Sequence, residues 1–218
     1  GHCSLRSQRR ICWERYLKYT ARDIKLGVEK FMVKKLTKDF IQAFYSPKSL
    51  YREISMGKQS SSWIFVLIYC LVYVLGSLWL YFKGFTPFVW TWIKLSEEYY
   101  YLVQSFYIIP LVFLMWILGT GVIHVVSKYF GGKGRFDVLF TMTGYSLWVP
   151  WYPLIIVDCI HSIPEWLYNI VLGICIILIL FGTTIATMIE ERINLIGAII
   201  STIIAFTSIG LILFTYIR

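Results

Sequence analysis

The sequence predicts an all-α membrane protein, a bundle of five transmembrane helices preceded by a basic amphipathic arm. Hydrophobic residues make up 58% of the 218 residues and charged residues only 15%, against about 45–50% and about 25% in ordinary soluble domains. The charges are segregated, since residues 1–58 hold 14 Lys and Arg against 5 Asp and Glu, whereas residues 59–218 hold seven of each. This pattern excludes a soluble enzyme, a disordered chain and a secreted disulfide scaffold.

Five apolar stretches lie in residues 59–218, and each has the roughly 20 residues that a helix needs to cross about 30 Å of hydrocarbon. We expect spans over residues 63–82, 102–127, 138–157, 166–189 and 193–217. The third span carries Pro150 and Pro153, and a re-entrant third segment would reduce the count to four. Its length favours a full crossing, and we expect Pro110, Pro150 and Pro153 to bend spans two and three.

The distribution of Lys and Arg predicts the orientation. With the arm placed in the cytoplasm, the flanking segments hold 18 Lys and Arg inside and 3 outside, so the N-terminus is expected in the cytoplasm and the C-terminus outside. The first apolar run begins only at Trp63, which is untypical of a cleaved signal peptide. The five cysteines form no C-x-x-C pair, and neither a zinc site nor a disulfide framework is expected.

Residues 1–58 are predicted to form a basic cytoplasmic arm with two short helices. Over residues 24–44, apolar side chains recur every four residues on one side, with Lys30, Lys34 and Lys38 on the other. Such a helix typically lies on a bilayer or docks on a partner, and nucleic acid is the disfavoured alternative. Ser46 is expected to cap a second helix over residues 47–56, which begins at a proline.

A glycine-rich hairpin joins spans two and three. Gly131, Gly132 and Gly134 flank Lys133 and precede Arg135, and glycines permit a tight reversal of the chain. A phosphate-cradling loop is disfavoured, because neither nucleotide-binding glycine pattern is present and no strand precedes the hairpin. We therefore expect a cytoplasmic turn between two helices.

These features together resemble the Yip domain of the Ypt/Rab-interacting membrane proteins. The shared pattern is a proline-led helix before the first span, a late His in span two, a "GGkG" hairpin and a "GYs-x-x-x-P" third span. The resemblance covers roughly residues 40–215 and implies five spans with a cytoplasmic N-terminus. The matching positions are Pro47, Tyr51 to Ile54, His124, Phe130 to Phe136, Gly144, Tyr145 and Pro150.

The arm departs from the eukaryotic members, which usually carry a longer acidic or proline-rich head with a D-L-[WY]-G-P type motif. The chain is more similar to the prokaryotic branch, for which the resemblance implies accessory roles beside other membrane proteins, including exporters. A prokaryotic plasma membrane is thus favoured over the endoplasmic reticulum or Golgi. A Rab-linked trafficking factor stays the alternative for a eukaryotic source.

The expected spans contain few ionisable residues. Their central thirds hold no Asp, Glu, Lys or Arg, whereas an ion-coupled transporter normally places paired ionisable groups there. For His124, a neutral imidazole that is hydrogen-bonded to a neighbouring helix is favoured over a ligand or relay role. Asp158 and His161 are expected to be solvated, with a cation site as the alternative. The turn Glu190-Glu191-Arg192 is expected to form the last hairpin, although its carboxylates could also meet a basic partner.

We therefore expect a non-enzymatic scaffold or accessory subunit that contacts membrane lipids and binds another integral membrane protein, for instance a transporter. No catalytic, cofactor or metal residues and no nucleic acid are expected, and a homo-oligomer is left open. The alternative is a small-molecule or lipid transporter or channel that uses spans two and three. Spans four and five should pack through small residues on each other or on a partner. The candidate partner or lipid contacts are Lys30, Lys34, Lys38, Tyr51, Arg52, Gly131, Gly132, Lys133, Gly134, Arg135, Gly197, Ser201 and Ala205, and the candidate intramembrane polar residues are His124, Tyr145 and Asp158.

Overall fold

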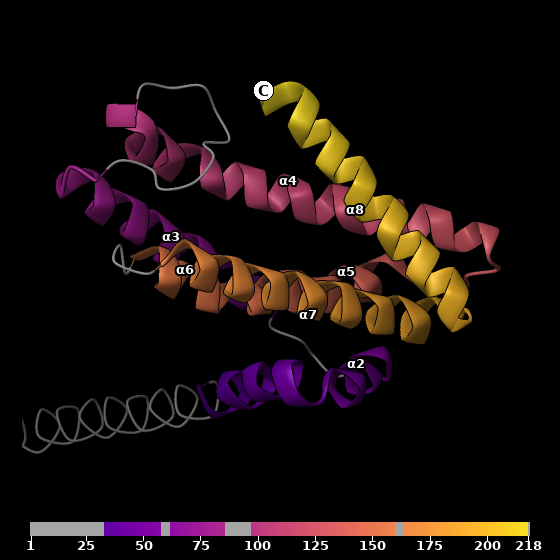
Figure 1. Cartoon of the computed structure of the whole chain (residues 1–218). Coiled ribbons are helices and arrows are strands. Elements are labelled where there is room, and N and C mark those ends of the chain that lie inside the picture. Colours follow the sequence, from indigo (N-terminus) through magenta and orange to yellow (C-terminus); the bar gives the residue numbers. More distant parts are fainter. Residues whose placement is uncertain (1–32, 58–61, 86–96, 160–163, 218) are drawn as a thin grey trace, which may run out of the picture. The chain divides into compact units, whose positions relative to one another are not determined.

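A computed structural model describes residues 33–57, 62–85, 97–159 and 164–217, without the side chains of residues 97, 158–159 and 212–217. The chain divides into two units, residues 1–41 and 42–218, and the described parts contain helices and no strand. The helices of the second unit (Figure 1) are α2 (Pro47–Ser55), α3 (Ser62–Phe82), η1 (Glu97–Tyr99), α4 (Tyr100–Tyr129), α5 (Phe136–Trp148), η2 (Val149–Trp151), α6 (Tyr152–Cys159), α7 (Glu165–Glu191) and α8 (Leu195–Ile217).

Three of the described helices, α3, α4 and α7, are long and apolar enough to cross a membrane. In α8 the stretch Leu195–Leu211 is a shorter apolar helix. The chain is thus an all-helical membrane protein, as expected, whereas the count of five spans stays a prediction.

The third expected span is divided into two helices. α5 ends at Trp148, a single 3₁₀ turn follows, and α6 begins at Tyr152. Pro150 and Pro153 lie in this break, and a proline removes a helical hydrogen bond and clashes with the preceding turn. By contrast, α4 runs unbroken through Pro110.

Helix α5 lies at the centre of the bundle and contacts α2, α3, α4 and α7. Leu139, Met142 and Tyr145 are completely buried along it. At Gly144 a Cβ atom would lie 2.6 Å from Cζ2 of Trp116 on α4. The absence of a side chain at Gly144 therefore lets α4 approach α5 closely.

Trp116 joins these two helices by ring stacking and by a hydrogen bond. Its ring stacks on Phe140 with centroids 3.9 Å apart, and its Nε1 donates to the Phe140 carbonyl at 2.9 Å. The hydroxyls of Thr120 and Thr143 lie 2.7 Å apart beside it. Because hydrocarbon offers no water, these polar groups are satisfied between the helices.

The small residues of α8 are buried inside the bundle. Gly197, Ser201 and Ala205 are all buried, and α8 packs on both α4 and α7. The opposite face of α8 exposes isoleucines, for example Ile196 at 68% and Ile203 at 52%. Helix α8 thus packs on α7, as expected for the last two apolar stretches, and also on α4, because its small residues let backbones approach.

The described part of the arm contains a helix over residues 33–45, on which Lys34 and Lys38 are exposed. Lys30 and most of the expected 24–44 helix lie outside the described residues. The helix ends before Ser46, whose side chain makes no capping hydrogen bond to α2, so the expected cap was wrong. The Pro47 ring pre-sets the first turn of α2 instead.

Helix α2 packs against α7 and α5 in the second unit. Leu50, Tyr51 and Ile54 are buried on that side, while Arg52 is exposed. Burial raises the pKa of the Tyr51 phenol. Tyr51 therefore anchors α2 to the bundle, and Arg52 is the residue of this pair that remains at the surface.

Candidate functional site

The glycine hairpin and the α7–α8 turn meet at one end of the bundle. Helix α7 ends with Glu190 and Glu191, whose exposed fractions are 6% and 0%. Arg192 then takes a left-handed conformation with φ 56°, which reverses the chain. Asn194 begins α8 by accepting a hydrogen bond from the Gly197 N–H at 2.8 Å, a standard helix cap.

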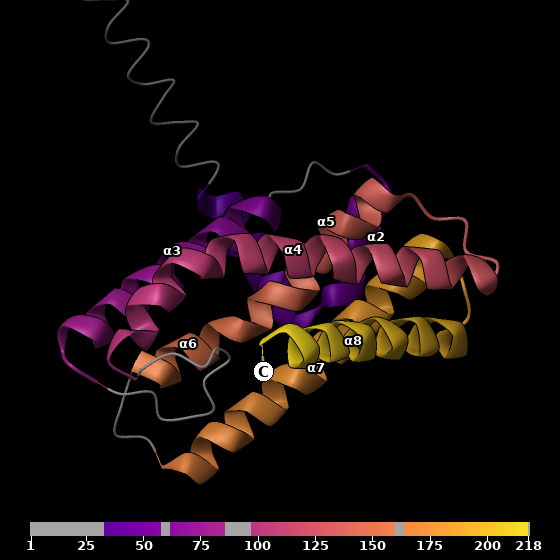
Figure 2. The same ribbon diagram turned by 90° about the horizontal axis from the view of Figure 1, so that it is seen from above.

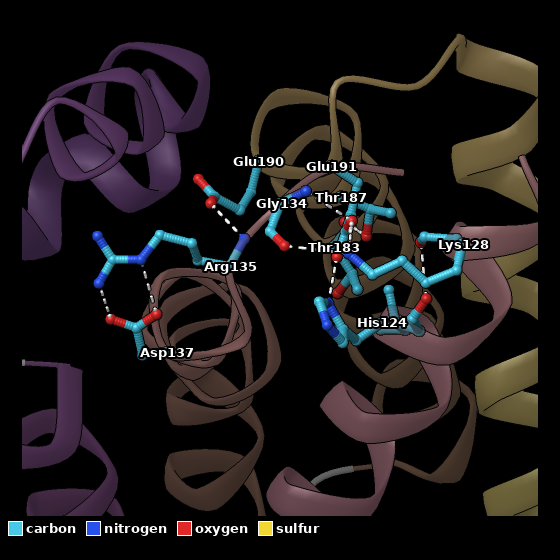
Figure 3. Close-up of polar contacts among 11 residues, drawn as sticks. His124, Lys128, Gly134, Arg135, Asp137, Thr183, Thr187, Glu190 and Glu191 are labelled. Carbon is cyan, nitrogen blue, oxygen red and sulfur yellow. Dashed lines mark hydrogen bonds and ion pairs between the residues drawn. The ribbon is translucent and has the colours of Figure 1, made fainter. Parts of the chain in front are cut away.

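Glu191 is held by helix α4 and by the hairpin (Figure 3). Its Oε1 lies 2.5 Å from His124 Nδ1, and its Oε2 accepts from Lys128 Nζ at 3.3 Å and from the Gly134 N–H at 3.0 Å. A carboxylate only accepts hydrogen bonds, so Nδ1 of His124 carries the hydrogen. The buried charge is thereby compensated by cationic and backbone donors.

Glu190 points away from Glu191 (Figure 3) and joins the hairpin to α2. Its Oε1 accepts from the Arg135 N–H at 2.9 Å, and its Oε2 accepts from Ser55 Oγ of α2 at 3.0 Å. The backbone is joined as well, because the Lys133 N–H donates to the Glu191 carbonyl at 3.0 Å. Glu190 and Glu191 with these hydrogen bonds form a clamp that fixes the hairpin, α2 and the end of α7 to one another.

Two hairpin glycines are required by these close approaches. A Cβ on Gly132 would lie 2.7 Å from Glu191 Oε2, and one on Gly134 would lie 2.6 Å from the Glu190 carbonyl oxygen. Gly131 has open space around it but a φ of 82°, which disfavours other residues. The glycines therefore serve both the turn and the seating of the two carboxylates.

The outer side of the hairpin carries exposed charges. Arg135 and Asp137 form a bidentate pair at 3.2 and 2.6 Å, with side chains 73% and 64% exposed. The hydrogen bond from Arg135 lowers the pKa of the Asp137 carboxyl. Lys133 is also exposed. The clamp on the inner side thus presents a charged loop in one fixed conformation.

The candidate intramembrane residues lie in different places. His124 is hydrogen-bonded to a neighbouring helix through Glu191, the contact that the sequence favoured. Tyr145 is buried elsewhere, with its ring centroid 5.4 Å from that of Phe65 on α3. The Asp158 side chain and all of His161 lie outside the described residues. In the described part of the chain, no three His, Cys, Asp or Glu side chains are placed to bind a metal.

Sequence reasoning missed the two glutamates, Ser55 and Lys128 as members of one site. The only available signal was a pair of carboxylates in a short turn on the basic side of a membrane protein, for which a basic partner was considered. In the structure these carboxylates meet donors of the same chain, namely Lys128 at the end of α4 and two backbone N–H groups of the hairpin.

The family model described as the Yip1 domain matches residues 41–216. The chain belongs to the Yip1 family. No curated protein and no solved structure matches it in the corresponding comparisons. The Yip1 match includes α2, the hairpin and both glutamates, so the clamp lies entirely within the family's domain.

Proposed function

We propose that this Yip1 protein is a non-enzymatic scaffold or accessory subunit that binds and stabilises another integral membrane protein. In this proposal the chain crosses the membrane five times, with α5, η2 and α6 together as the third crossing and the arm in the cytoplasm of a prokaryotic cell. The excess of Lys and Arg on the arm side supports that orientation.

The observation that carries the proposal is the uncovered first half of α7. From Glu165 to Ile174 no residue of α7 is buried, and Cys175 is the first that is. Figures 1 and 2 show α7 and α8 meeting at one end and diverging toward the other. The small residues of α8 are already used inside the bundle, so this part of α7 is the better candidate surface.

A polar residue lies on this surface, near the start of α7. The Asn169 side chain is exposed and makes no hydrogen bond within the described part of the chain, and a Cβ on Gly173, one turn further, would meet nothing within 4 Å. An amide on a membrane-facing helix gains a hydrogen bond when another helix packs on it, and a glycine permits that approach. The expected occupant is a transmembrane helix with a small and a hydrogen-bonding side chain.

The test is site-specific photo-crosslinking in native membranes. A photoreactive amino acid at position 169 should give one adduct of defined mass with another membrane protein, and the same group at Ile203, exposed on α8, should give none. Asn169→Leu should reduce recovery of the stoichiometric complex, whereas Ile203→Leu should not. An adduct of two copies of this chain, or unchanged recovery with Asn169→Leu, would refute the proposal.

A small-molecule pathway is the second candidate, and unpaired polar atoms favour it. Gln104 donates to the Tyr73 hydroxyl at 2.6 Å, but its Oε1 and the Nε1 of Trp148 are buried without partners among the described residues. Such groups cost roughly 1–3 kcal/mol each unless a ligand or water satisfies them. Proton and chloride flux into proteoliposomes that falls with Gln104→Leu would support this function, and flux equal to that of protein-free liposomes would reject it.

A further inference from the structure

We propose that Lys133 and Arg192 together bind the phosphate of an anionic phospholipid from the surrounding bilayer. This site is independent of the proposed partner surface on α7. It rests on the position of two cations at the end of the bundle, on their lack of protein partners and on their depth relative to the apolar surface.

The clamp brings the two cations onto neighbouring turns. The Lys133 N–H donates to the Glu191 carbonyl at 3.0 Å, and Arg192 follows Glu191 directly. Both side chains are exposed, and neither has an ion pair or side-chain hydrogen bond within the described residues. Two adjacent free cations provide five guanidinium N–H donors and an ammonium for one anion.

Nearby acidic groups are already engaged. Glu191 is bound by His124 and Lys128, Glu190 accepts from the Arg135 N–H, and Asp137 pairs with the Arg135 guanidinium. Lys133 and Arg192 therefore remain available for an external anion.

The apolar surface places these cations at headgroup level. Leu195 and Ile196, the first residues of α8, are 55% and 68% exposed, so the hydrocarbon-facing surface begins within one turn of Arg192. On α4 the same transition falls between Val125, which is 58% exposed, and Lys128. Both helices thus put the boundary at the hairpin, and lipid phosphates lie at that boundary.

Aromatic side chains occupy the same level. Tyr129 and Phe130 are 85% and 41% exposed, and Phe130 lies against Gly197 in the first turn of α8, where a Cβ would be 3.0 Å from its ring. Exposed aromatic rings are typical of the membrane–water interface. In the orientation proposed above this end faces the cytoplasm, where the negative surface potential of anionic lipids attracts Lys and Arg near the membrane surface.

The test measures lipid retention by native mass spectrometry of the full chain, released from nanodiscs that contain equal amounts of phosphatidylglycerol and phosphatidylcholine. We expect retained phosphatidylglycerol in the unchanged protein. The variant with Lys133→Gln and Arg192→Gln should bind it about 25-fold more weakly, at roughly fivefold for each headgroup-level cation. The matched control is Lys83→Gln, which changes an exposed lysine directly after the C-terminal end of α3. This variant should retain phosphatidylglycerol fully.

Three results would overturn the proposal. These are equal retention of the two lipids, equal retention by the double variant and the unchanged protein, and displacement of the lipid by millimolar inorganic phosphate, which would indicate a site for a soluble anion. Thermal unfolding in phosphatidylcholine nanodiscs checks that the double variant folds. If it does not, Lys133→Gln alone decides, because this side chain is exposed and should show the fivefold loss.

Discussion

Neutralising Glu191 should destabilise the protein far more than its position beside a surface turn suggests. The carboxylate is completely buried and accepts from His124, Lys128 and the Gly134 N–H. In Glu191→Gln one oxygen becomes an NH₂ group that faces other donors. Hydrogen bonds to a charged group contribute roughly 1.5–3 kcal/mol each when buried.

The magnitude follows from the exposure of each partner. The Lys128 side chain is 43% exposed, so its contact contributes only about 0–1 kcal/mol. The other two contacts are better shielded, since the His124 side chain is 21% exposed. The variant loses one of these two contacts, and its new NH₂ group repels the remaining donors. Together these effects should lower the free energy of unfolding by about 3 kcal/mol. That corresponds to a fall in Tm of roughly 6–12 °C for a chain of this size.

Thiol reactivity provides the assay, because Cys70 and Cys175 are 1% and 2% exposed. In a background with the other three cysteines changed to serine, a thiol-reactive dye reports unfolding of the bundle on heating. Glu165→Gln, at the exposed start of the same helix, is the control and should leave Tm within about 2 °C. A shift below 2 °C for Glu191→Gln, or equal shifts for both variants, would refute the idea that the clamp stabilises the fold.

Three further substitutions, one of them with a matched control, test the packing. Gly134→Ala puts a Cβ 2.6 Å from a backbone carbonyl of α7 and should lower Tm by several degrees in the same assay, whereas Gly121→Ala, with open space, should leave it unchanged or raise it; equal effects would contradict the clash. Gly144→Ala should displace Trp116 and shift the tryptophan emission, and an unchanged spectrum together with an unchanged Tm would count against the close α4–α5 contact. Ser201→Ala removes a buried hydroxyl without a partner among the described residues and should leave Tm unchanged or slightly higher, so a marked fall would reveal an unseen hydrogen bond.

Composition and periodicity predicted much of the fold. Runs of about 20 apolar residues mark α3, α4 and α7, because a helix must bury its backbone polar groups internally in hydrocarbon. The helix break before Pro47 was also predictable, since proline restricts the residue that precedes it. The division of the third span exceeded the bend expected from its prolines, because Pro150 and Pro153 act within one turn of each other.

The candidate site was only partly predictable. Glycines in the hairpin indicated a tight turn, but local sequence could not show that Gly134 must admit the Glu190 carbonyl or that Glu191 bonds to His124, which is 67 positions away. The buried face of α8 was identified by its small residues, but whether that face met this chain or a partner depended on how α4 lay beside it.

The sequence by itself determined that the chain enters a membrane, which end is basic and where most helices begin and end, because these depend on local hydrophobicity, charge and backbone preferences. Only the tertiary structure decided that two adjacent glutamates would hold the glycine hairpin and α2 in place. A buried carboxylate is stable only where donors from other segments converge on it. That convergence depends on the packing of helices that are distant in the chain.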